Sequence, residues 1–476
     1  MAVACGVKIK DSAETEILMA IIPHKVIIRL TEPQPNWAQA GVAAINNLRG
    51  VEVLVATSQL TPDVILHYGD NPVEACQQYG YGRLGFWFFR FAGRDIDVLK
   101  AARHSAAKNL PLEVSLWVRF VDGRCQCLYQ SFGFHEPFVV KRGVATNLAK
   151  AAYFPVRVLT TYCKTTLLPA ITPEIMMIES SACHARFAEA KAIAQKIVRK
   201  IIYKEQWFVV AGLSKDECLD MHAQWVLDPG SGCFWADPFP VEHDGRCWVM
   251  VEELPYASGR GHLAAIELFN DGTYSASQPV MSGDQHLSYP FVFSWHNALY
   301  MLPESSAARN VVLWKCLQFP DRWEQAAVLL TDLRAVDATL IEYQDMWWMF
   351  VAMAHEGACV HDELHVYFAD SPLGPWQAHP ENPVKSDARN ARPAGNLYIE
   401  NGILYRPAQD CATEYGKATV LNRVDCLDKQ HFSETPIARL DSQWRKDFLR
   451  THTLSRSENI WAVDGLRLIP RWRLPS

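Results

Sequence analysis

Four carboxyl residues in the second half of the chain, Asp237, Glu253, Glu304 and Asp337, occupy related positions in a sequence repeat. Such groups are what a glycosidic bond requires when it is made or broken. Its oxocarbenium-like transition state is served by one carboxylate acting as nucleophile or base and by a second, protonated carboxyl acting as acid. The two groups lie about 5 Å apart for retention and up to about 9.5 Å apart for inversion. The elements that carry these residues must therefore converge.

The repeat itself supplies a reason for that convergence. Each copy begins with a polar residue and continues with an apolar strand, a turn and a second apolar strand. A period of about 48 to 60 residues built from strand pairs is typical of a β-propeller with one four-stranded blade per repeat. The sequence therefore predicts five blades whose first residues line one end of the central channel. These residues are Asp237, Tyr289, Asp337, Arg392 and His452.

The propeller is expected to cover residues 206–476. Because propellers commonly close their ring by pairing strands from both ends of the domain, the strand beginning at Gln206 and the strand around 465–469 should lie in the same or adjacent blades. Residues 161–205 form a connector, in which 180–204 has the three-and-four spacing of an amphipathic helix.

The preceding part, residues 16–160, alternates strands with helices and predicts an α/β domain with a mostly parallel sheet. Two further segments resemble a hairpin, because apolar runs flank the turn Asp122-Gly123. The strands are expected at 17–30, 51–57, 64–68, 84–91, 114–121 and 125–129, and a helix at 35–48.

Composition excludes several classes of function. The net charge is −6 and the Lys and Arg residues are dispersed, so no electrostatic footprint for nucleic acid is present. The longest apolar runs fall short of the ~20 residues that span a bilayer, so no transmembrane segment is predicted. No signal peptide opens the chain and the 13 Cys form no CxxC pair, which predicts a cytoplasmic protein with reduced thiols. The sequence does not determine the oligomeric state.

Metal and cofactor motifs are not found in the sequence. The His residues show no HExxH spacing, and neither standard Gly-rich phosphate loop occurs. The sequence therefore predicts no structural zinc and no cofactor, and it leaves open a calcium ion in the channel.

The carboxyl residues also have structural explanations. Asp237 precedes a proline, and an Asp at that position is a common turn former. Glu253 and Glu304 follow the second apolar strands of their repeats and could simply bond backbone groups at blade edges. Only their shared place in the repeat favours chemistry.

Two of the repeats resemble the five-bladed glycoside hydrolases of family 43. Trp235-Ala-Asp237-Pro-Phe is similar to their first-blade signature, and Asp337-Ala-Thr-Leu-Ile to their third-blade strand. The resemblance implies that Asp237 acts as base or nucleophile and that Asp337 orients the acid. It departs at the fourth blade, where those hydrolases place the acid Glu and this chain has Arg392.

That departure favours an anionic substrate, because a guanidinium binds phosphate or carboxylate bidentately. Arg392 and Arg406 would form an anion clamp. A nucleotide sugar, a lipid-phosphate sugar or a uronate then fits better than a neutral glycan. Other expected substrate-binding residues are Gln409, Asp410, His286, Tyr289, His452 and Arg260.

A closer resemblance covers roughly residue 206 to the C-terminus. This region is similar to the propeller at the N-terminus of plant glucosamine inositolphosphorylceramide transferases, and of bacterial proteins that carry a formyltransferase-like domain before it. The motifs that carry the resemblance, in order, are Gly259-Arg-Gly-His262, His286-Leu-Ser-Tyr-Pro290, Pro303-Glu304, Leu373-Gly-Pro-Trp376, Asn382-Pro383, Arg406-Pro-Ala-Gln409-Asp410 and Tyr415-Gly416.

The N-terminal domain resembles a degenerate formyltransferase-like domain, one in which the catalytic residues are not retained. Formyltransferases use an Asn, a His and a distal Asp, and no Asn-x-His at a strand end is found here; His67 and Asp70 are the nearest polar cluster. The leading hypothesis is therefore an enzyme that makes or breaks a sugar linkage in glycolipid or surface polysaccharide biosynthesis, with Asp237 as base or nucleophile and Glu304 or Glu253 as acid. The alternatives are a non-catalytic sugar-binding propeller and, least favoured, formyl or acyl transfer to an amino sugar.

Overall fold

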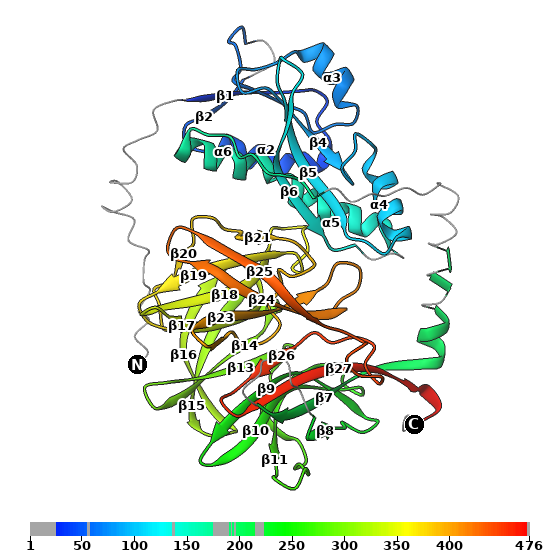
Figure 1. The fold of residues 1–476 in the computed structure, drawn as a ribbon, viewed down its shortest axis with the longest axis vertical. Coiled ribbons are helices and arrows are strands. Elements are labelled where there is room, and N and C mark those ends of the chain that lie inside the picture. Colours follow the sequence, from blue (N-terminus) through cyan, green and yellow to red (C-terminus); the bar gives the residue numbers. More distant parts are fainter. Residues whose placement is uncertain are drawn as a thin grey trace. The chain divides into compact units, whose positions relative to one another are not determined.

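The computed structural model describes residues 25–54, 58–135, 139–174, 190–214 except 192, 195 and 196, and 223–473. These residues fall into two compact units (Figure 1). The first contains the described residues up to Ile96 together with Ser115–Gln130 and those from Ala151 to 174. The second contains Asp97–Val114, the described residues of Ser131–Lys150 and those from 190 onward.

The N-terminal region is built on a six-stranded sheet of order β2-β1-β3-β4-β5-β6. β1 is parallel to β2 and to β3, and β3 is parallel to β4, as the alternation of strands and helices predicted. The strands are β1 (Val26–Leu30), β2 (Val51–Leu54), β3 (Val64–Leu66), β4 (Phe86–Phe91), β5 (Leu112–Arg119) and β6 (Cys125–Gly133). The predicted strand residues 17–24 and 55–57 lie outside the described residues.

Local signals set the helices of this region. Asp97 caps α4 by accepting a hydrogen bond from the Lys100 N–H at 2.9 Å. Pro72 opens α3, where a missing N–H costs nothing. The helical elements are η1 (Asn36–Ala38), α2 (Gln39–Asn46), α3 (Pro72–Tyr79), α4 (Val98–Ala107), α5 (Val140–Ala151) and α6 (Phe154–Thr165). Described residues between 190 and 202 are also helical, and the earlier part of the helix predicted at 180–204 lies outside the described residues.

The propeller has five blades, which confirms the prediction from the repeat. Each blade is an antiparallel sheet with four strands that follow one another in sequence in blades 1 to 4, and blade 3 adds β21 beside β19. Blade 1 contains β9 (Cys233–His243), β10 (Arg246–Pro255), β11 (His262–Leu268) and β12 (Gln278–Met281), and blade 2 contains β13 (Ser288–Trp295), β14 (Ala298–Glu304), β15 (Asn310–Gln318) and β16 (Arg322–Thr331). Blade 3 contains β17 (Arg334–Tyr343), β18 (Met346–Ala354), β19 (Glu363–Ala369), β20 (Gln377–Ala378) and β21 (Lys385–Ser386). Blade 4 contains β22 (Tyr398–Glu400), β23 (Ile403–Asp410), β24 (Ala418–Leu427) and β25 (Phe432–Leu440).

Blade 5 closes the ring with strands from both ends of the domain, as predicted. It contains β26 (Leu454–Arg456), β27 (Ile460–Pro470), β7 (Tyr203–Leu213) and β8 (Trp225–Leu227). β27 pairs antiparallel with β7 over its whole length, from Ile460 opposite Leu213 to Pro470 opposite Tyr203. No free strand edge is left at the junction.

Aromatic and aliphatic side chains hold neighbouring blades together. One buried cluster joins blades 1, 2 and 3 through residues such as Phe239, Phe291 and Trp347. Another joins blades 3 and 4 through Trp348, Phe350 and Leu404. Each fully buried side chain of this size contributes about 1.5–3 kcal/mol, so the packing between blades fixes the inner strands around the channel.

The inner strands of blades 1, 2 and 3 share one irregularity. In each, two residues lie between successive paired positions of the inner strand where only one lies between the paired positions of its partner. In blade 1, for example, Ala236 pairs with Glu252 and Phe239 with Met250. The extra residue is accommodated at a bulge with a left-handed backbone, at Asp237 (φ 51°), Tyr289 (φ 49°) and Asp337 (φ 56°). The same bulge therefore gives the side chains at the equivalent position of three blades the same local backbone geometry.

The fourth and fifth repeats differ from this pattern. Arg392 and His452 were expected at strand starts, but β22 begins only at Tyr398 and β26 at Leu454. Both residues lie in irregular backbone before their strands. Among the helices that the structure describes, none is long and apolar enough to cross a membrane.

Candidate functional site

Asp237 lies at the centre of a buried hydrogen-bond cluster. Its Oδ1 accepts a hydrogen bond from the Thr453 hydroxyl at 2.9 Å, and its Oδ2 accepts one from the backbone N–H of Tyr289 at 3.2 Å. The side chain is almost fully buried, with 5% of the residue exposed. Blades 5, 1 and 2 therefore meet at this one carboxylate.

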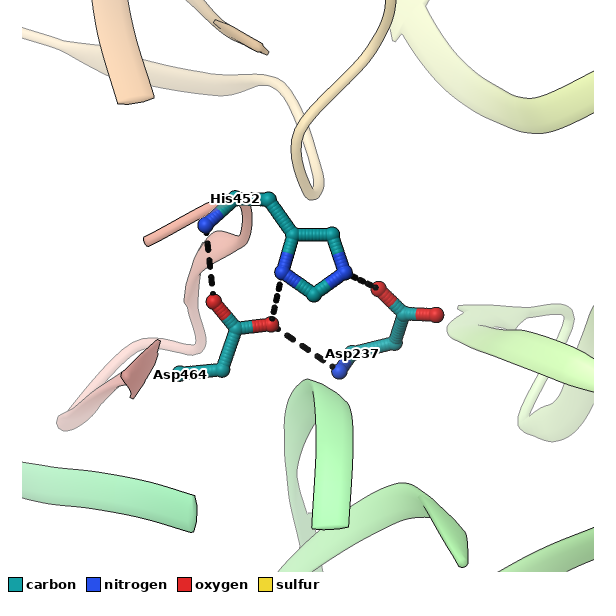
Figure 2. Close-up of side chains that lie close together, drawn as sticks. All are labelled: Asp237, His452 and Asp464. Carbon is teal, nitrogen blue, oxygen red and sulfur yellow. Dashed lines mark hydrogen bonds and ion pairs between the residues drawn. The ribbon is translucent and has the colours of Figure 1, made fainter. Parts of the chain in front are cut away.

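His452 bridges Asp237 and a second carboxylate, Asp464 (Figure 2). Nε2 of His452 is 3.3 Å from Oδ1 of Asp237, and Nδ1 is 2.7 Å from Oδ2 of Asp464. Asp464 in turn accepts hydrogen bonds from the backbone N–H groups of His452 and Thr453, and from that of Asp237. The imidazole is thus held from both sides by residues of β27 and β9.

The charges of this cluster favour a protonated imidazole. Burial alone would lower the pKa of His452, but the neighbouring Asp464 and Asp237 outweigh burial and raise that pKa to about 10. Ligand atoms of Asp237, His452 and Asp464 lie within 4.8 Å of one another, close enough to hold a metal ion. A metal would have to displace the imidazole proton, because only neutral imidazole coordinates. The geometry therefore suits an imidazolium between two carboxylates better than a metal centre.

This arrangement makes the stability of the propeller depend on pH. The pKa of His452 is about 10 in the folded protein and ordinarily 6.5, so its contribution is complete below pH 6.5 and is lost as pH rises toward 10. We expect the unfolding free energy of the wild type to fall relative to that of His452→Gln by at most about 1.4 kcal/mol per pH unit across this range. Urea unfolding of both proteins between pH 6 and 10 measures the difference. A pH-independent difference would contradict the bridging role.

Asp337 forms the second cluster, around a guanidinium. Nε of Arg392 donates to Oδ2 of Asp337, and Nη2 donates to Oδ1 at 3.1 Å. Nε2 of Gln409 donates to the same Oδ2 at 3.0 Å. Nη1 of Arg392 lies 2.7 Å from Nδ1 of His361, a residue that the sequence did not single out. Asp337 is 2% exposed, so the pair is a buried, bidentate ion pair.

Glu304 lies next to that pair and has the properties of an acid. Its Oε2 is 3.8 Å from Nη2 of Arg392. Burial and the charge of Asp337 raise the pKa of Glu304 well above its usual value, and Arg392 opposes this only in part. A carboxyl group that stays protonated near neutral pH is what a general acid requires.

Tyr289 connects the two clusters. Its backbone N–H donates to Asp237, while its hydroxyl lies 2.9 Å from that of Thr339, which donates to the Asp337 carbonyl. The hydroxyl also donates to the carbonyl of Gly395 and accepts from the Gly395 N–H. With its N–H and its hydroxyl both engaged within the protein, the buried Tyr289 acts as a link between blades rather than as an exposed sugar contact.

The structure separates Glu252 from Glu253. Glu253 accepts from the indole N–H of Trp235 at 2.7 Å and lies 3.3 Å from His262, away from Asp237. Glu252 is buried, and its pKa is raised by burial and by the charge of Asp237, against the opposing contact with His286 at 3.0 Å. Glu252 is thus the blade 1 carboxyl that joins the Asp237 cluster, and the expectation that Glu253 does so needs correction.

The remaining expected binding residues have other partners. Arg406 was expected in an anion clamp, but Nε and Nη2 grip Glu434 at 2.7 and 2.6 Å while Nη1 and Nη2 donate to backbone carbonyls. Asp410 pairs with Arg439 at 2.8 Å. Arg260 is exposed and donates to the carbonyl of Asp284. His286, with 47% of its side chain exposed, is the accessible member beside Glu252.

The polar cluster noted in the N-terminal region is engaged within its own sheet. Nδ1 of His67 lies 2.8 Å from the Thr31 hydroxyl, and Nε2 lies 2.9 Å from the Asp70 carbonyl. Burial lowers the pKa of His67. Both ring nitrogens thus have structural partners, which gives no support to acyl transfer at this residue.

Sequence comparisons concern the propeller. Residues 225–456 match the family model described as "Glucosamine inositolphosphorylceramide transferase 1, N-terminal". Curated relatives of that name include one from Oryza sativa subsp. japonica, 33% identical over 208 residues, which are 43% of this chain and 28% of that protein. One from Arabidopsis thaliana is 28% identical over 250 residues, 49% of this chain and 32% of that protein. The match thus spans about a third or less of these relatives.

Solved structures similar to this chain include family-43 glycoside hydrolases. A thermostable family-43 enzyme is 12% identical with a TM-score of 0.34, over 44% of this chain and 76% of that chain. The GH43_1 enzyme from Xanthomonas citri is 8% identical with a TM-score of 0.37, over 51% of this chain and 88% of that chain.

Proposed function

We propose that this chain, whose propeller resembles the N-terminal domain of glucosamine inositolphosphorylceramide transferases, makes or breaks a glycosidic linkage at the channel site. Asp237 serves as base or nucleophile and Glu304 as acid, while Asp337 and Arg392 position the acid and set its protonation. The biological setting proposed is the assembly of a glycolipid or surface polysaccharide.

One observation carries this proposal: two buried carboxyl groups of the site have opposite electrostatic surroundings. Asp237 lies 3.3 Å from the imidazolium of His452, which places a positive charge beside it. Glu304 faces the carboxylate of Asp337, which favours its protonated form. Environments that separate the charge states of two carboxyl groups are how one site supplies both a base and an acid.

The charges of the site bear on the kind of sugar. Arg392 was expected to clamp an anion, but its guanidinium is committed to Asp337 and His361. The carboxylates Asp237, Asp337 and Asp464 outnumber the two cations, Arg392 and His452, that pair with them. An amino sugar, such as the one in the name of the relatives, complements that charge better than a uronate does. If the donor is a nucleotide sugar, we propose that its phosphates lie outside this cluster.

A binding and turnover panel tests the proposal. Wild-type protein is titrated calorimetrically with glucosamine, N-acetylglucosamine, glucose and glucuronate, each free and as its nucleotide sugar. Release of the nucleotide or of free sugar is followed in parallel. Preference for the amino sugar together with turnover of at least one donor is expected, and an absence of both binding and turnover across the panel would remove the proposal.

The protonation of Glu304 predicts a pH profile. The acid must carry its proton, so activity should fall as pH rises through the raised pKa of Glu304. Glu304→Gln cannot donate a proton, and we expect it to lower kcat by about 10²–10⁴-fold and to abolish this alkaline limb. The measurement is kcat against pH for both proteins. The matched control is Glu253→Gln, whose carboxyl lies outside the cluster and whose profile should follow that of the wild type.

A second candidate function is a sugar-binding propeller that catalyses nothing. The observation that favours it is the complete engagement of Asp337, which is bound by Arg392 and Gln409 and is 2% exposed. In that case the wild type would bind sugar without turning over any donor, and Glu304→Gln would change affinity alone.

A further inference from the structure

A segment far ahead of the propeller in sequence belongs to the same compact unit as the candidate site. Residues 131–150, which include most of α5, cluster with the propeller and not with the first unit. Ala388 donates its backbone N–H to the Phe132 carbonyl at 2.7 Å, and His135 donates to the Ala412 carbonyl at 3.0 Å. The segment thus bonds the irregular backbone on either side of Arg392 and Gln409.

The strongest of these contacts is a buried ion pair. Nζ of Lys150, on α5, lies 2.8 Å from Oδ2 of Asp362, and their side chains are only 1% and 2% exposed. Oδ1 of Asp362 has no hydrogen-bond partner among the described residues, so Lys150 carries most of the compensation for burying this charge. A buried carboxylate that loses its only cation costs several kcal/mol. The pair therefore fixes the backbone at Asp362.

That backbone presents His361 to the site. Nδ1 of His361 lies 2.7 Å from Nη1 of Arg392. Its ring meets Phe134, from the same N-terminal segment, edge-on at 5.0 Å and also packs against Tyr415. An unprotonated Nδ1 of His361 accepts a hydrogen bond from Nη1 of Arg392. Asp337 binds Nε and Nη2, so His361 occupies the remaining nitrogen of the guanidinium.

We infer that Lys150 is a positioning residue for the candidate site: through Asp362 it holds His361 against Arg392 and thereby fixes the orientation of Asp337. The role of Lys150 in catalysis rests on the proposed function, whereas the contacts from Lys150 to Asp337 do not depend on it. It extends the site to a part of the chain that precedes the first propeller strand.

The protonation of His361 reports on this chain of contacts. Burial, and then the charge of Arg392, hold the pKa of His361 well below its usual value. The titratable and charged groups around it are Arg392 and Tyr415 from blade 4, with Asp362 and Cys359 on its own loop. When the loop is released, His361 should reach water and titrate near its ordinary pKa of about 6.5.

The test is histidine titration in the full-length protein. Imidazole ¹⁵N signals are recorded between pH 5 and 8, with that of His361 assigned by its loss in His361→Gln. We expect His361 not to titrate in the wild type and in Lys150→Arg, which keeps the cation, but to titrate between about pH 5 and 7 in Lys150→Met. Leu313→Ala, a buried truncation in blade 2, controls for lost stability and should leave His361 silent.

Asp362→Asn provides a milder second variant if Lys150→Met does not fold. It keeps the shape of the side chain while removing its charge, and it should make His361 titrate as well. A His361 that stays silent in every folded variant of the pair would overturn the inference, as would titration in Leu313→Ala. None of these readouts needs a substrate. A wild type that binds no sugar would therefore contradict the proposed function without affecting the positioning role of Lys150.

Discussion

Asp237→Asn is expected to reduce turnover by about 10²–10⁴-fold while leaving the fold and the affinity for sugar nearly unchanged. The amide keeps the size of the carboxyl group, and its oxygen still accepts from the Tyr289 N–H or the Thr453 hydroxyl. It loses the negative charge that a base or nucleophile needs. Left-handed backbone, with φ of 51° at this position, is well tolerated by Asn. Steady-state turnover beside calorimetric affinity measures the split.

A control from the same cluster separates chemistry from packing. Thr453→Val removes one hydrogen bond to Asp237 but leaves its charge, so it should cost far less turnover. If Asp237→Asn retained full activity, this residue would have no part in the mechanism. If it lost affinity and turnover equally, the site would bind sugar through Asp237 without using it in catalysis.

Arg392→Ala is expected to lower the free energy of unfolding by about 3–5 kcal/mol, because it leaves Asp337 buried without its cation. This differs from the effect of an anion clamp, whose loss would weaken ligand binding and spare stability. The double variant Arg392→Met/Asp337→Leu removes both charges and should recover most of the loss. Urea unfolding of the wild type and Arg392→Ala measures the loss, and Arg392→Met, Asp337→Leu and the double variant complete the cycle.

The matched control for this cycle is a second arginine with a carboxylate partner in the propeller. Arg456 pairs with Glu400 at 3.1 Å but is partly exposed, so Arg456→Ala should cost about 1 kcal/mol or less. Equal losses for Arg392→Ala and Arg456→Ala would show that the Asp337 pair does not stabilise the channel.

The repeat was sufficient to predict the propeller, because blade number follows from period and strand pairing. It placed Asp237, Tyr289 and Asp337 at equivalent positions, and the structure gives all three the same bulge. The closure between the strand at Gln206 and the last strand also followed, since a ring without it would leave open edges.

The partners of these residues could not be predicted in the same way. The repeat alignment matched Glu253 to Glu304, but the strand register pairs Glu252 with Ala236 in blade 1 as it pairs Glu304 with Ser288 in blade 2, so Glu252 is the true equivalent. Asp464 sits where the repeat has a turn-like Asp-Gly, and only the pairing of β27 with β7 makes it a buried partner. For Arg392, the sequence shows a cation but not the carboxylate that occupies it. Such contacts depend on pairing between strands that are far apart in the chain, and this pairing cannot be read from a single sequence.

Ring closure has a consequence for synthesis of the chain on the ribosome. β7 is made first, yet its partner β27 emerges about 250 residues later, a delay of roughly 12 to 50 s at ordinary translation rates. Until then β7 presents an unpaired edge, which is the kind of surface that chaperones cover and aggregates recruit. Asp464 arrives on that same final strand, so a nascent or prematurely terminated propeller has neither a closed ring nor a partner for His452.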